Sequence, residues 1–202
     1  MTSTWDARFA ASEPGRAGPP AGLVGRTDLV PGSGRALDVA CGRGTVAVWL
    51  AQRGLVVDAV DAAPAGLALG ARLAADAGVT VRWVSADLER GLPLDGPYDV
   101  VVCQRYRDPS LYPALAGVLA PGGLLVVTVL STVGDAGGRF RAAPGELRTA
   151  FADPAVARGL DVLVDEEGSG EATLVARRRD EDRPAPVSPA AASPGPRRGP
   201  GG

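Results

Sequence analysis

The chain has 202 residues, of which 46% are hydrophobic, and its formal net charge is −2 with a sequence pI of about 5.2. This length suits about one domain with enough apolar residues for a core. The slightly acidic balance disfavours nucleic acid as a main partner. No apolar run approaches the ~18 residues of a membrane span, and residues 1–16 lack the pattern of a secretory signal. We therefore expect a cytoplasmic protein with neither a nucleic-acid nor a membrane partner.

Missing residue types exclude several kinds of chemistry. The sequence has no His and no Lys, so all 21 basic residues are Arg. Catalysis by Ser-His-Asp or Cys-His sets, imidazole metal sites and a P-loop lysine are therefore excluded. Two cysteines, Cys41 and Cys103, are too few for a zinc cluster, so no metal site is expected. Any reaction must depend on a cofactor that brings its own reactivity.

Strand and helix signals alternate from residue 35 to residue 130. The second predicted helix runs from Pro64 to Gly78, and a third begins at Asp108-Pro109 and extends to Leu119 before Pro121 ends it. Because the strands are almost continuously apolar and separated by helices, they predict a parallel sheet covered on both faces. Short apolar runs place these strands at 35–40, 55–60, 79–84, 99–103 and 124–130.

The end of the domain has a different pattern. A helix is predicted from Pro144 through Phe151, followed by strands at 160–164 and 172–176. The turn DEEGSGE between these strands is too short for a crossover, which predicts an antiparallel hairpin. Residues 1–180 are thus expected to form one α/β domain. Residues 181–202 are rich in Pro, Ala and Gly and predict a disordered tail.

Three polar features follow three consecutive predicted strands. The first strand leads into a turn with Gly42 and Gly44, where a side chain would occupy the space of a small cofactor. Asp61 ends the second strand, where an acid can accept hydrogen bonds from both hydroxyls of a ribose. Asp87 follows the third strand and suits an adenine amine. Each feature alone is also typical of a plain turn, a solvated acid or a helix cap. Together they indicate a cofactor that contains a nucleoside.

The motifs that carry these residues resemble those of the class I S-adenosylmethionine-dependent methyltransferases. ALDVACGRGT, VVDAVDAAPAGL and VSADLE are similar to the first three motifs of that family, and YDVVVCQRY and LAPGGLLVVTVL to its fourth and fifth strands. WDARFA, LDVACGRGTVAVWLA and PGELRTAF further resemble small bacterial tellurite-resistance methyltransferases. Ala40 departs from the pattern because it replaces the first glycine of the first motif. The loop RFRAAPGEL departs around its usual polar residues.

The resemblance implies a Rossmann-like doubly wound sheet of five parallel strands plus a C-terminal antiparallel hairpin, in the order 3-2-1-4-5-7-6. It also implies S-adenosylmethionine as the cofactor. Ala40, Gly42 and Gly44 would pass beneath its methionine part, and Asp38 would orient that turn. The other residues that the resemblance assigns to the cofactor are Asp61 at the ribose, Asp87 and the Leu88 backbone at the adenine, and Cys103 and Gln104 near the sulfonium.

Candidates for substrate contact lie outside these motifs. Arg105 and Tyr106 follow the fourth strand, and Trp5 and Arg8 lie on an expected N-terminal helix that could cover the pocket. The alternative for each is packing or exposure to solvent.

The implied function is transfer of the methyl group of S-adenosylmethionine to a small-molecule nucleophile by in-line displacement, which can depend on positioning and desolvation alone. One alternative is a non-catalytic S-adenosylmethionine-binding protein. Another is a nicotinamide dinucleotide oxidoreductase, whose glycine motif would require glycine at positions 40, 42 and 45, where this chain has Ala40, Gly42 and Thr45. The sequence leaves the methyl acceptor and the oligomeric state open.

Overall fold

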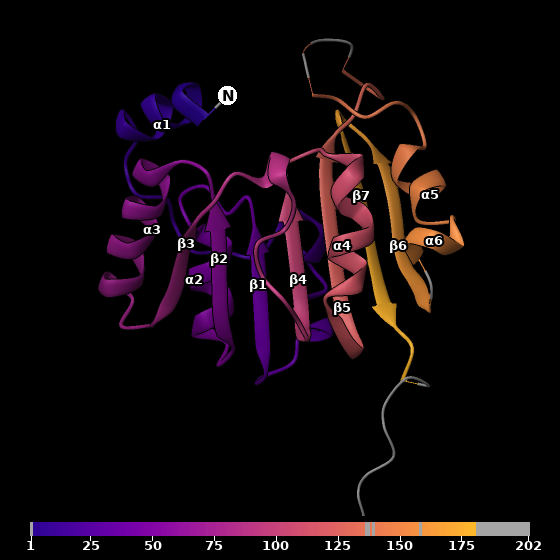
Figure 1. Ribbon diagram of the computed structural model, residues 1–202, viewed down its shortest axis with the longest axis horizontal. Coiled ribbons are helices and arrows are strands. Elements are labelled where there is room, and N and C mark those ends of the chain that lie inside the picture. The colour runs from indigo at the N-terminus through magenta and orange to yellow at the C-terminus, as the bar shows by residue number, and fades with distance from the viewer. Residues whose placement is uncertain (1, 136–137, 139, 158, 181–202) are drawn as a thin grey trace, which may run out of the picture.

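A sheet of seven strands forms the centre of the computed structural model, which describes residues 2–135, 138, 140–157 and 159–180. The strand order is β3-β2-β1-β4-β5-β7-β6, which confirms the predicted topology (Figure 1). The first five strands are parallel, and β7 is antiparallel to both β5 and β6. The predicted tail, residues 181–202, lies outside the described residues. The strands are β1 (Arg35–Val39), β2 (Val56–Asp61), β3 (Val81–Ser85), β4 (Tyr98–Gln104), β5 (Leu119–Leu130), β6 (Leu160–Gly168) and β7 (Glu171–Arg178).

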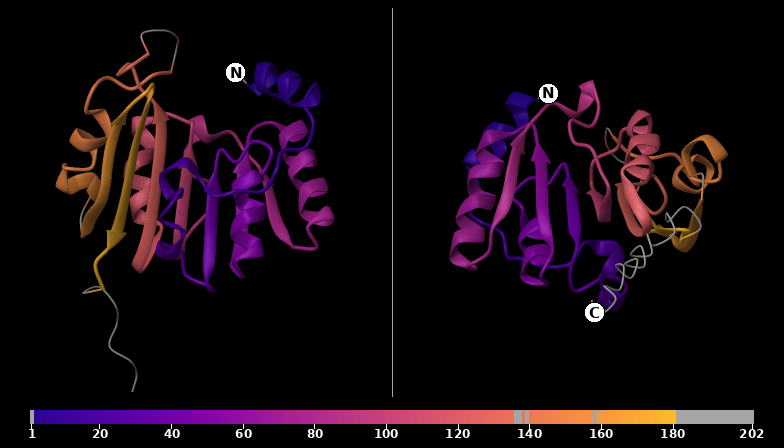
Figure 2. Two further views of the ribbon diagram at one scale, coloured as in Figure 1. Left: turned by 180° about the vertical axis from the view of Figure 1, so that it is seen from behind. Right: turned by 60° about the horizontal axis from the view of Figure 1, so that its bottom comes forward.

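Helices cover both faces of the sheet, as the apolar strands require. One face packs against α4 and α5 through Tyr112, Leu115 and Leu147. The other packs against α2 and α3, and Figure 2 shows this face in its left panel. The helices are α1 (Thr2–Ala10), α2 (Thr45–Gln52), α3 (Pro64–Asp76), α4 (Tyr112–Gly117), α5 (Glu146–Ala150) and α6 (Pro154–Ala157), with short 3-10 turns η1 (Ala21–Leu23), η2 (Thr27–Leu29), η3 (Leu88–Arg90) and η4 (Pro109–Leu111).

The N-terminal strap, residues 11–30, packs on the same face of the sheet as α2 and α3, over the strands that these helices do not cover. Its turn η1 contacts β5 and β7. Leu23 is fully buried there. A Cβ at Gly22 would lie 2.7 Å from Cγ2 of Thr173, so only glycine allows so close an approach. The strap therefore belongs to the core of the domain.

Element boundaries differ most from the prediction in two places. The third predicted helix ends at Gly117, and β5 begins at Leu119, which pairs with Tyr98 at the start of β4. The hairpin strands are longer than predicted, and the turn between them contains only Ser169 and Gly170, both with positive φ. In both places strand pairing extends into segments whose glycine, proline or acidic residues are typical of turns.

The structure contains no helix, within its described residues, that is long and apolar enough to cross a membrane.

Candidate cofactor site at the carboxyl edge of the sheet

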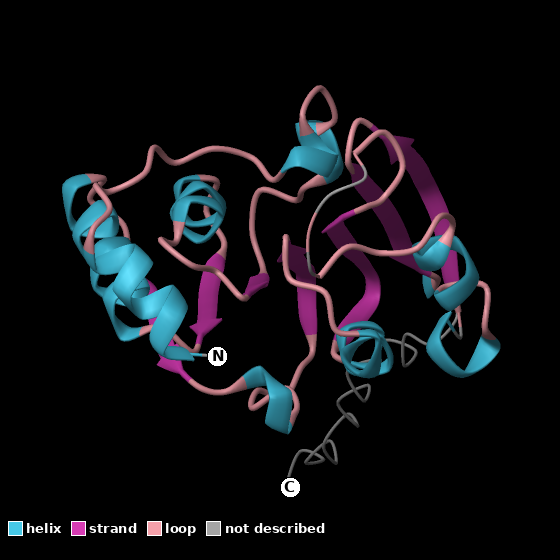
Figure 3. Ribbon diagram, turned by 90° about the horizontal axis from the view of Figure 1, so that it is seen from above, coloured by secondary structure: helices cyan, strands magenta, loops and turns pink. Residues whose placement is uncertain are grey.

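The carboxyl ends of the parallel strands meet at one edge of the sheet, which Figure 3 shows from above. Backbone hydrogen bonds join the segments that leave these strands. The Cys41 N–H donates to the carbonyl of Val60 at 3.0 Å, and the Ala86 N–H donates to the carbonyl of Asp61 at 3.0 Å. The segments after β1, β2 and β3, which carry the predicted cofactor residues, are therefore brought together, as the resemblance implies.

The turn between β1 and α2 has an unusual backbone. Ala40, Gly42 and Gly44 all have positive φ values of 55°, 53° and 67°. Asp61 holds this turn from the end of β2, because its Oδ2 accepts the Gly42 N–H at 2.8 Å and its Oδ1 accepts the Ala63 N–H at 2.9 Å. Each carboxylate oxygen has a second lone pair that remains able to accept a hydrogen bond.

Protein packing accounts for Gly44 and makes the space at Gly42 tight. A Cβ at Gly44 would collide with the ring of Trp83, and a Cβ at Gly42 would lie 3.1 Å from the Phe9 ring. The sequence predicted that a side chain at these positions would occupy the space of a cofactor. In the structure, the atoms that such a side chain meets first belong to Trp83 of β3 and Phe9 of α1.

Asp38 is the most deeply buried acid of the site, with an exposed fraction of 2%. Its Oδ2 has no hydrogen-bond partner among the described residues. Burial raises the pKa of Asp38 to about 7, and the negative charge of Asp61 adds to the increase. A hydrogen bond from the Ala47 backbone acts in the opposite direction and lowers the pKa. A buried carboxyl with an unused oxygen is suited to a cation or a hydrogen-bond donor supplied by a ligand.

Helix α1 lies above this edge of the sheet, beside the start of α3 (Figure 1). Asp6 accepts the N–H of Ala65 at 2.7 Å, so α1 supplies a cap to the first turn of α3. Phe9 stacks on Trp5 with 5.9 Å between ring centroids, and the Arg8 guanidinium lies 5.0 Å from the centroid of Trp5. Trp5 itself is 45% exposed. The helix thus covers the glycine turn with Phe9 and presents Trp5 and Arg8 to solvent.

Asp87 and Leu88 have local structural roles at the end of β3. Asp87 is exposed, and its Oδ1 accepts the Glu89 N–H at 3.1 Å, which caps η3. Its Oδ2 lies 3.9 Å from Arg90. Leu88 is buried in the apolar cluster beneath. Asp87 therefore serves as a cap and keeps carboxylate lone pairs free for a ligand.

The residues after β4 form the opposite side of the site. Arg105 has a φ of 58° and donates to Glu171 from Nε at 2.9 Å. Tyr106 is half-buried, and burial raises its pKa to about 12. Burial also raises the pKa of Cys103 to about 12 and raises that of Cys41. These groups keep their protons near neutral pH, so they are not bases or nucleophiles.

Two contacts near the site were not predicted. Arg107 and Glu146 form a two-point ion pair, with Nε–Oε1 and Nη2–Oε2 distances of 2.7 and 2.6 Å. Gln104 accepts the backbone N–H of Ala21 at 2.8 Å. Glu146 belongs to the segment RFRAAPGEL, and its departure from the family pattern was the one sign in the sequence that this segment is unusual. Nothing in the sequence indicates the contact of Ala21. The described residues contain no group of three or more His, Cys, Asp or Glu side chains placed to hold a metal ion.

Comparison with known proteins shows what the chain is similar to. Residues 36–123 match the family described as a methyltransferase domain. The ubiquinone biosynthesis O-methyltransferase of Caulobacter sp. (strain K31) is 36% identical over 103 residues, which are 48% of this chain and 41% of that protein. The chain thus spans less than half the length of this curated relative.

Solved structures share the fold. TehB from Haemophilus influenzae superposes with a TM-score of 0.65 at 17% identity, covering 78% of this chain and 61% of that one. Magnesium protoporphyrin IX methyltransferase from Synechocystis PCC 6803, solved with bound SAH, gives a TM-score of 0.59 at 17% identity, covering 88% and 82% of the two chains. Residues 36–123 are therefore similar to a methyltransferase domain, and the chain shares the fold of these methyltransferase structures.

Proposed function

We propose that the chain binds S-adenosylmethionine over the carboxyl ends of β1, β2 and β3 and transfers its methyl group to a small-molecule nucleophile. The observation that carries this proposal is the unpartnered, buried Oδ2 of Asp38 beside the glycine turn that Asp61 holds in place. Such a carboxyl fits a cationic cofactor. Asp61 and Asp87 at the ends of the next strands fit its ribose and adenine.

The chain contributes positioning and exclusion of water. When bound, S-adenosylmethionine supplies a methyl carbon that is already activated by its sulfonium. Phe9 lies over Gly42 of the glycine turn and would limit the access of water to a cofactor bound there. Tyr106 and Cys103 stay protonated near neutral pH because burial raises the pKa of each to about 12. Neither of these two groups takes a proton from the acceptor, so an acceptor that presents its own lone pair, such as an acidic hydroxyl or a soft nucleophile, suits this site.

The acceptor class follows from the same reasoning. We propose a small molecule with an acidic hydroxyl, such as a phenol, and the O-methyltransferase named among the relatives supports this choice. Arg105, Tyr106, Trp5 and Arg8 are the proposed substrate-facing residues. We also propose a cytoplasmic location without a nucleic-acid partner, supported by the pI of about 5.2 and the lack of Lys.

Thermal denaturation with single ligands tests the cofactor. A ligand at 100 times its Kd adds about 2.7 kcal/mol to the free energy of unfolding. We expect S-adenosylmethionine and its demethylated product to raise the melting temperature and NAD to leave it unchanged. The opposite pattern would indicate the oxidoreductase alternative.

Mass spectrometry then tests the reaction. We expect a product heavier by one methyl group when the protein is incubated with S-adenosylmethionine and a catechol or hydroxyquinone panel. Tight cofactor binding with no methylated product across oxygen, nitrogen and sulfur nucleophiles would favour the non-catalytic binding protein.

A further inference from the structure

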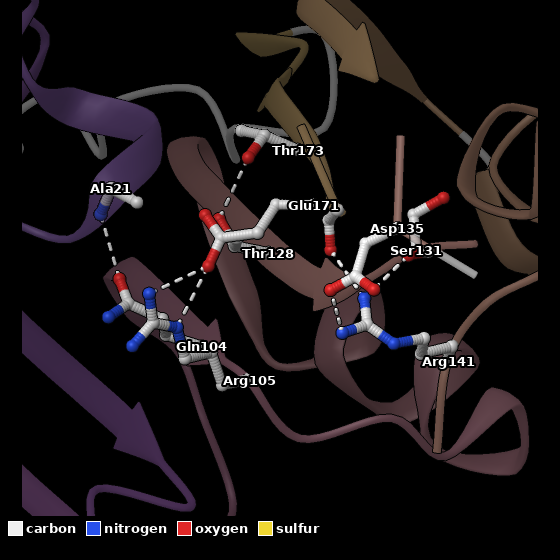
Figure 4. Close-up of polar contacts among 10 residues, drawn as sticks. Ala21, Gln104, Arg105, Thr128, Ser131, Asp135, Arg141, Glu171 and Thr173 are labelled. Carbon is white, nitrogen blue, oxygen red and sulfur yellow. Dashed lines mark hydrogen bonds and ion pairs between the residues drawn. The ribbon is translucent and has the colours of Figure 1, made fainter. Parts of the chain in front are cut away.

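The side chain of Gln104 is held in a fixed orientation by the N-terminal strap. Its Oε1 accepts the backbone N–H of Ala21 at 2.8 Å, across 83 positions of the chain (Figure 4). Ala21 is anchored because it begins η1, and Leu23 in the same turn is fully buried. The contact therefore fixes which end of the carboxamide faces the strap.

A carboxamide whose oxygen accepts an N–H must direct its NH2 group elsewhere. In Figure 4 the Gln104 nitrogen points away from Ala21. Gln104 is half-buried, and no hydrogen bond of its Nε2 occurs within the described part of the chain. Two N–H donors are thus held in place at the end of β4 with no acceptor among the described residues, and they are available to a ligand.

The position of this donor pair follows from the strand register. Val39 of β1 pairs with Cys103 of β4, so Gln104 is level with Ala40, the first residue of the glycine turn. Val102 packs on the α2 face of the sheet, and alternation along the strand places Gln104 on that same face. The amide therefore lies beside the glycine turn and the start of α2.

The order of the strands sets the direction of a ligand along this edge. Asp87 and Asp61 follow β3 and β2, and β1 and β4 come next in the sheet. A ligand with its adenosine at β3 and β2 extends its other end toward β4. In S-adenosylmethionine that end is an amino acid. Its carboxylate needs hydrogen-bond donors, whereas its ammonium needs an acceptor such as the unused oxygen of Asp38.

We propose that the Gln104 amide donates to the carboxylate of the methionine part of the cofactor, and that the Ala21 N–H is the positioning group that orients it. This inference rests on the proposed function and adds a role for the strap. The strap then contributes to cofactor recognition through one backbone donor, without touching the cofactor itself.

Calorimetric titration with two ligands tests the assignment. S-adenosylmethionine and its decarboxylated form differ only in the carboxylate. In Gln104→Glu one carboxylate oxygen can still accept the Ala21 N–H, but both donors are lost and a like charge is added. We expect Kd for S-adenosylmethionine to rise at least tenfold, as the loss of a hydrogen bond to a charged group predicts. Kd for the decarboxylated ligand should not rise by more than about twofold, since its contacts are unchanged.

Two further variants isolate the parts of the argument. Ala21→Pro removes only the N–H, because Pro is suited to the first position of a helical turn and Pro20 already has an extended ψ of 152°. It should weaken S-adenosylmethionine binding severalfold and spare the decarboxylated ligand. Gln52→Glu makes the same charge change at an exposed position of α2 and should leave both affinities unchanged.

The outcomes separate this inference from the proposed function. Equal weakening of both ligands in Gln104→Glu, or no weakening of either, would overturn the carboxylate assignment while cofactor binding stands. Failure of the unmodified protein to bind either ligand would overturn the proposed function itself.

Discussion

At the scale of single residues, the acids around the candidate site are held mainly by backbone N–H groups. Asp61 accepts from Gly42 and Ala63, Asp87 from Glu89, and Asp6 from Ala65. Hydrogen bonds from N–H groups orient a carboxylate without neutralising it. The site therefore keeps a negative field, which suits a cofactor that carries a sulfonium and an ammonium.

Asp38→Asn tests the buried carboxyl. The pKa of Asp38 in the folded state is about 7, above its usual value of 3.8. Between these two pH values the unfolded chain has lost the proton and the folded chain keeps it, so folding stability falls as pH rises, by up to ~1.4 kcal/mol per pH unit. Urea denaturation from pH 4 to 8 should show this loss in the unmodified protein relative to Asp38→Asn. Parallel stability curves would mean that Asp38 has an ordinary pKa.

Asp61→Ala tests the proposed ribose contact. The variant loses an acceptor for two hydroxyls and also releases the Gly42 N–H, so we expect cofactor affinity to fall by about 1.5–3 kcal/mol. Asp76→Ala removes an exposed acid at the end of α3 and should leave the affinity unchanged. Circular dichroism checks that both variants fold. Unchanged calorimetric affinity in a folded Asp61→Ala protein would remove Asp61 from the site.

The sequence is sufficient to predict residues whose position depends only on neighbouring residues in the chain. Asp38, Gly42 and Asp61 lie at strand ends that can be found from local apolar patterns. Gln104 could be placed near the sulfonium by resemblance, but its partner is a backbone group far along the chain, so its orientation depends on tertiary packing. The same holds for Glu146, whose ion pair with Arg107 joins two loops.

At the scale of elements, strands buried on both faces were predictable because their composition is nearly continuous in Val, Leu and Ala. The edge strand β6 was predicted too short because Asp165, Glu166 and Glu167 are typical of a loop. In the fold these acids have partners outside the strand: Arg148, Arg26 and Ser131. These contacts offset the low strand propensity of the acids. They come from tertiary packing, so local propensity cannot predict them.

Gly70→Ala tests the packing of α3 on β3. Gly70 has an ordinary helical backbone, but a Cβ there would lie 2.6 Å from Cη2 of Trp83. Overpacking of this kind costs ~1–3 kcal/mol, which exceeds the gain in helix propensity. Gly117→Ala is the matched control in α4, because a Cβ there meets no atom within 4 Å. Thermal denaturation should show a loss for Gly70→Ala and no loss for Gly117→Ala. Equal stabilities would contradict close packing at Trp83.

At the scale of the whole molecule, the sequence suggests where the domain stops. We propose that residues 181–202 are not part of it, because their composition offers little apolar surface to offset the entropy of ordering. Deletion of residues 183–202 should leave the melting temperature and cofactor affinity unchanged. Deletion of residues 177–202 removes Arg177, which donates to the carbonyls of Gly122 and Leu29, and should lower the melting temperature. A loss of stability in the shorter deletion would show that the tail contributes.

The position of the strap has a consequence for how the chain folds during synthesis. Leu23 is made before the surface that buries it, which includes Val126 and Val175. Contacts of such long separation in sequence form slowly. We therefore expect the strap to remain undocked until β7 has emerged, so that the orientation of Gln104 is fixed only after β7 has been made.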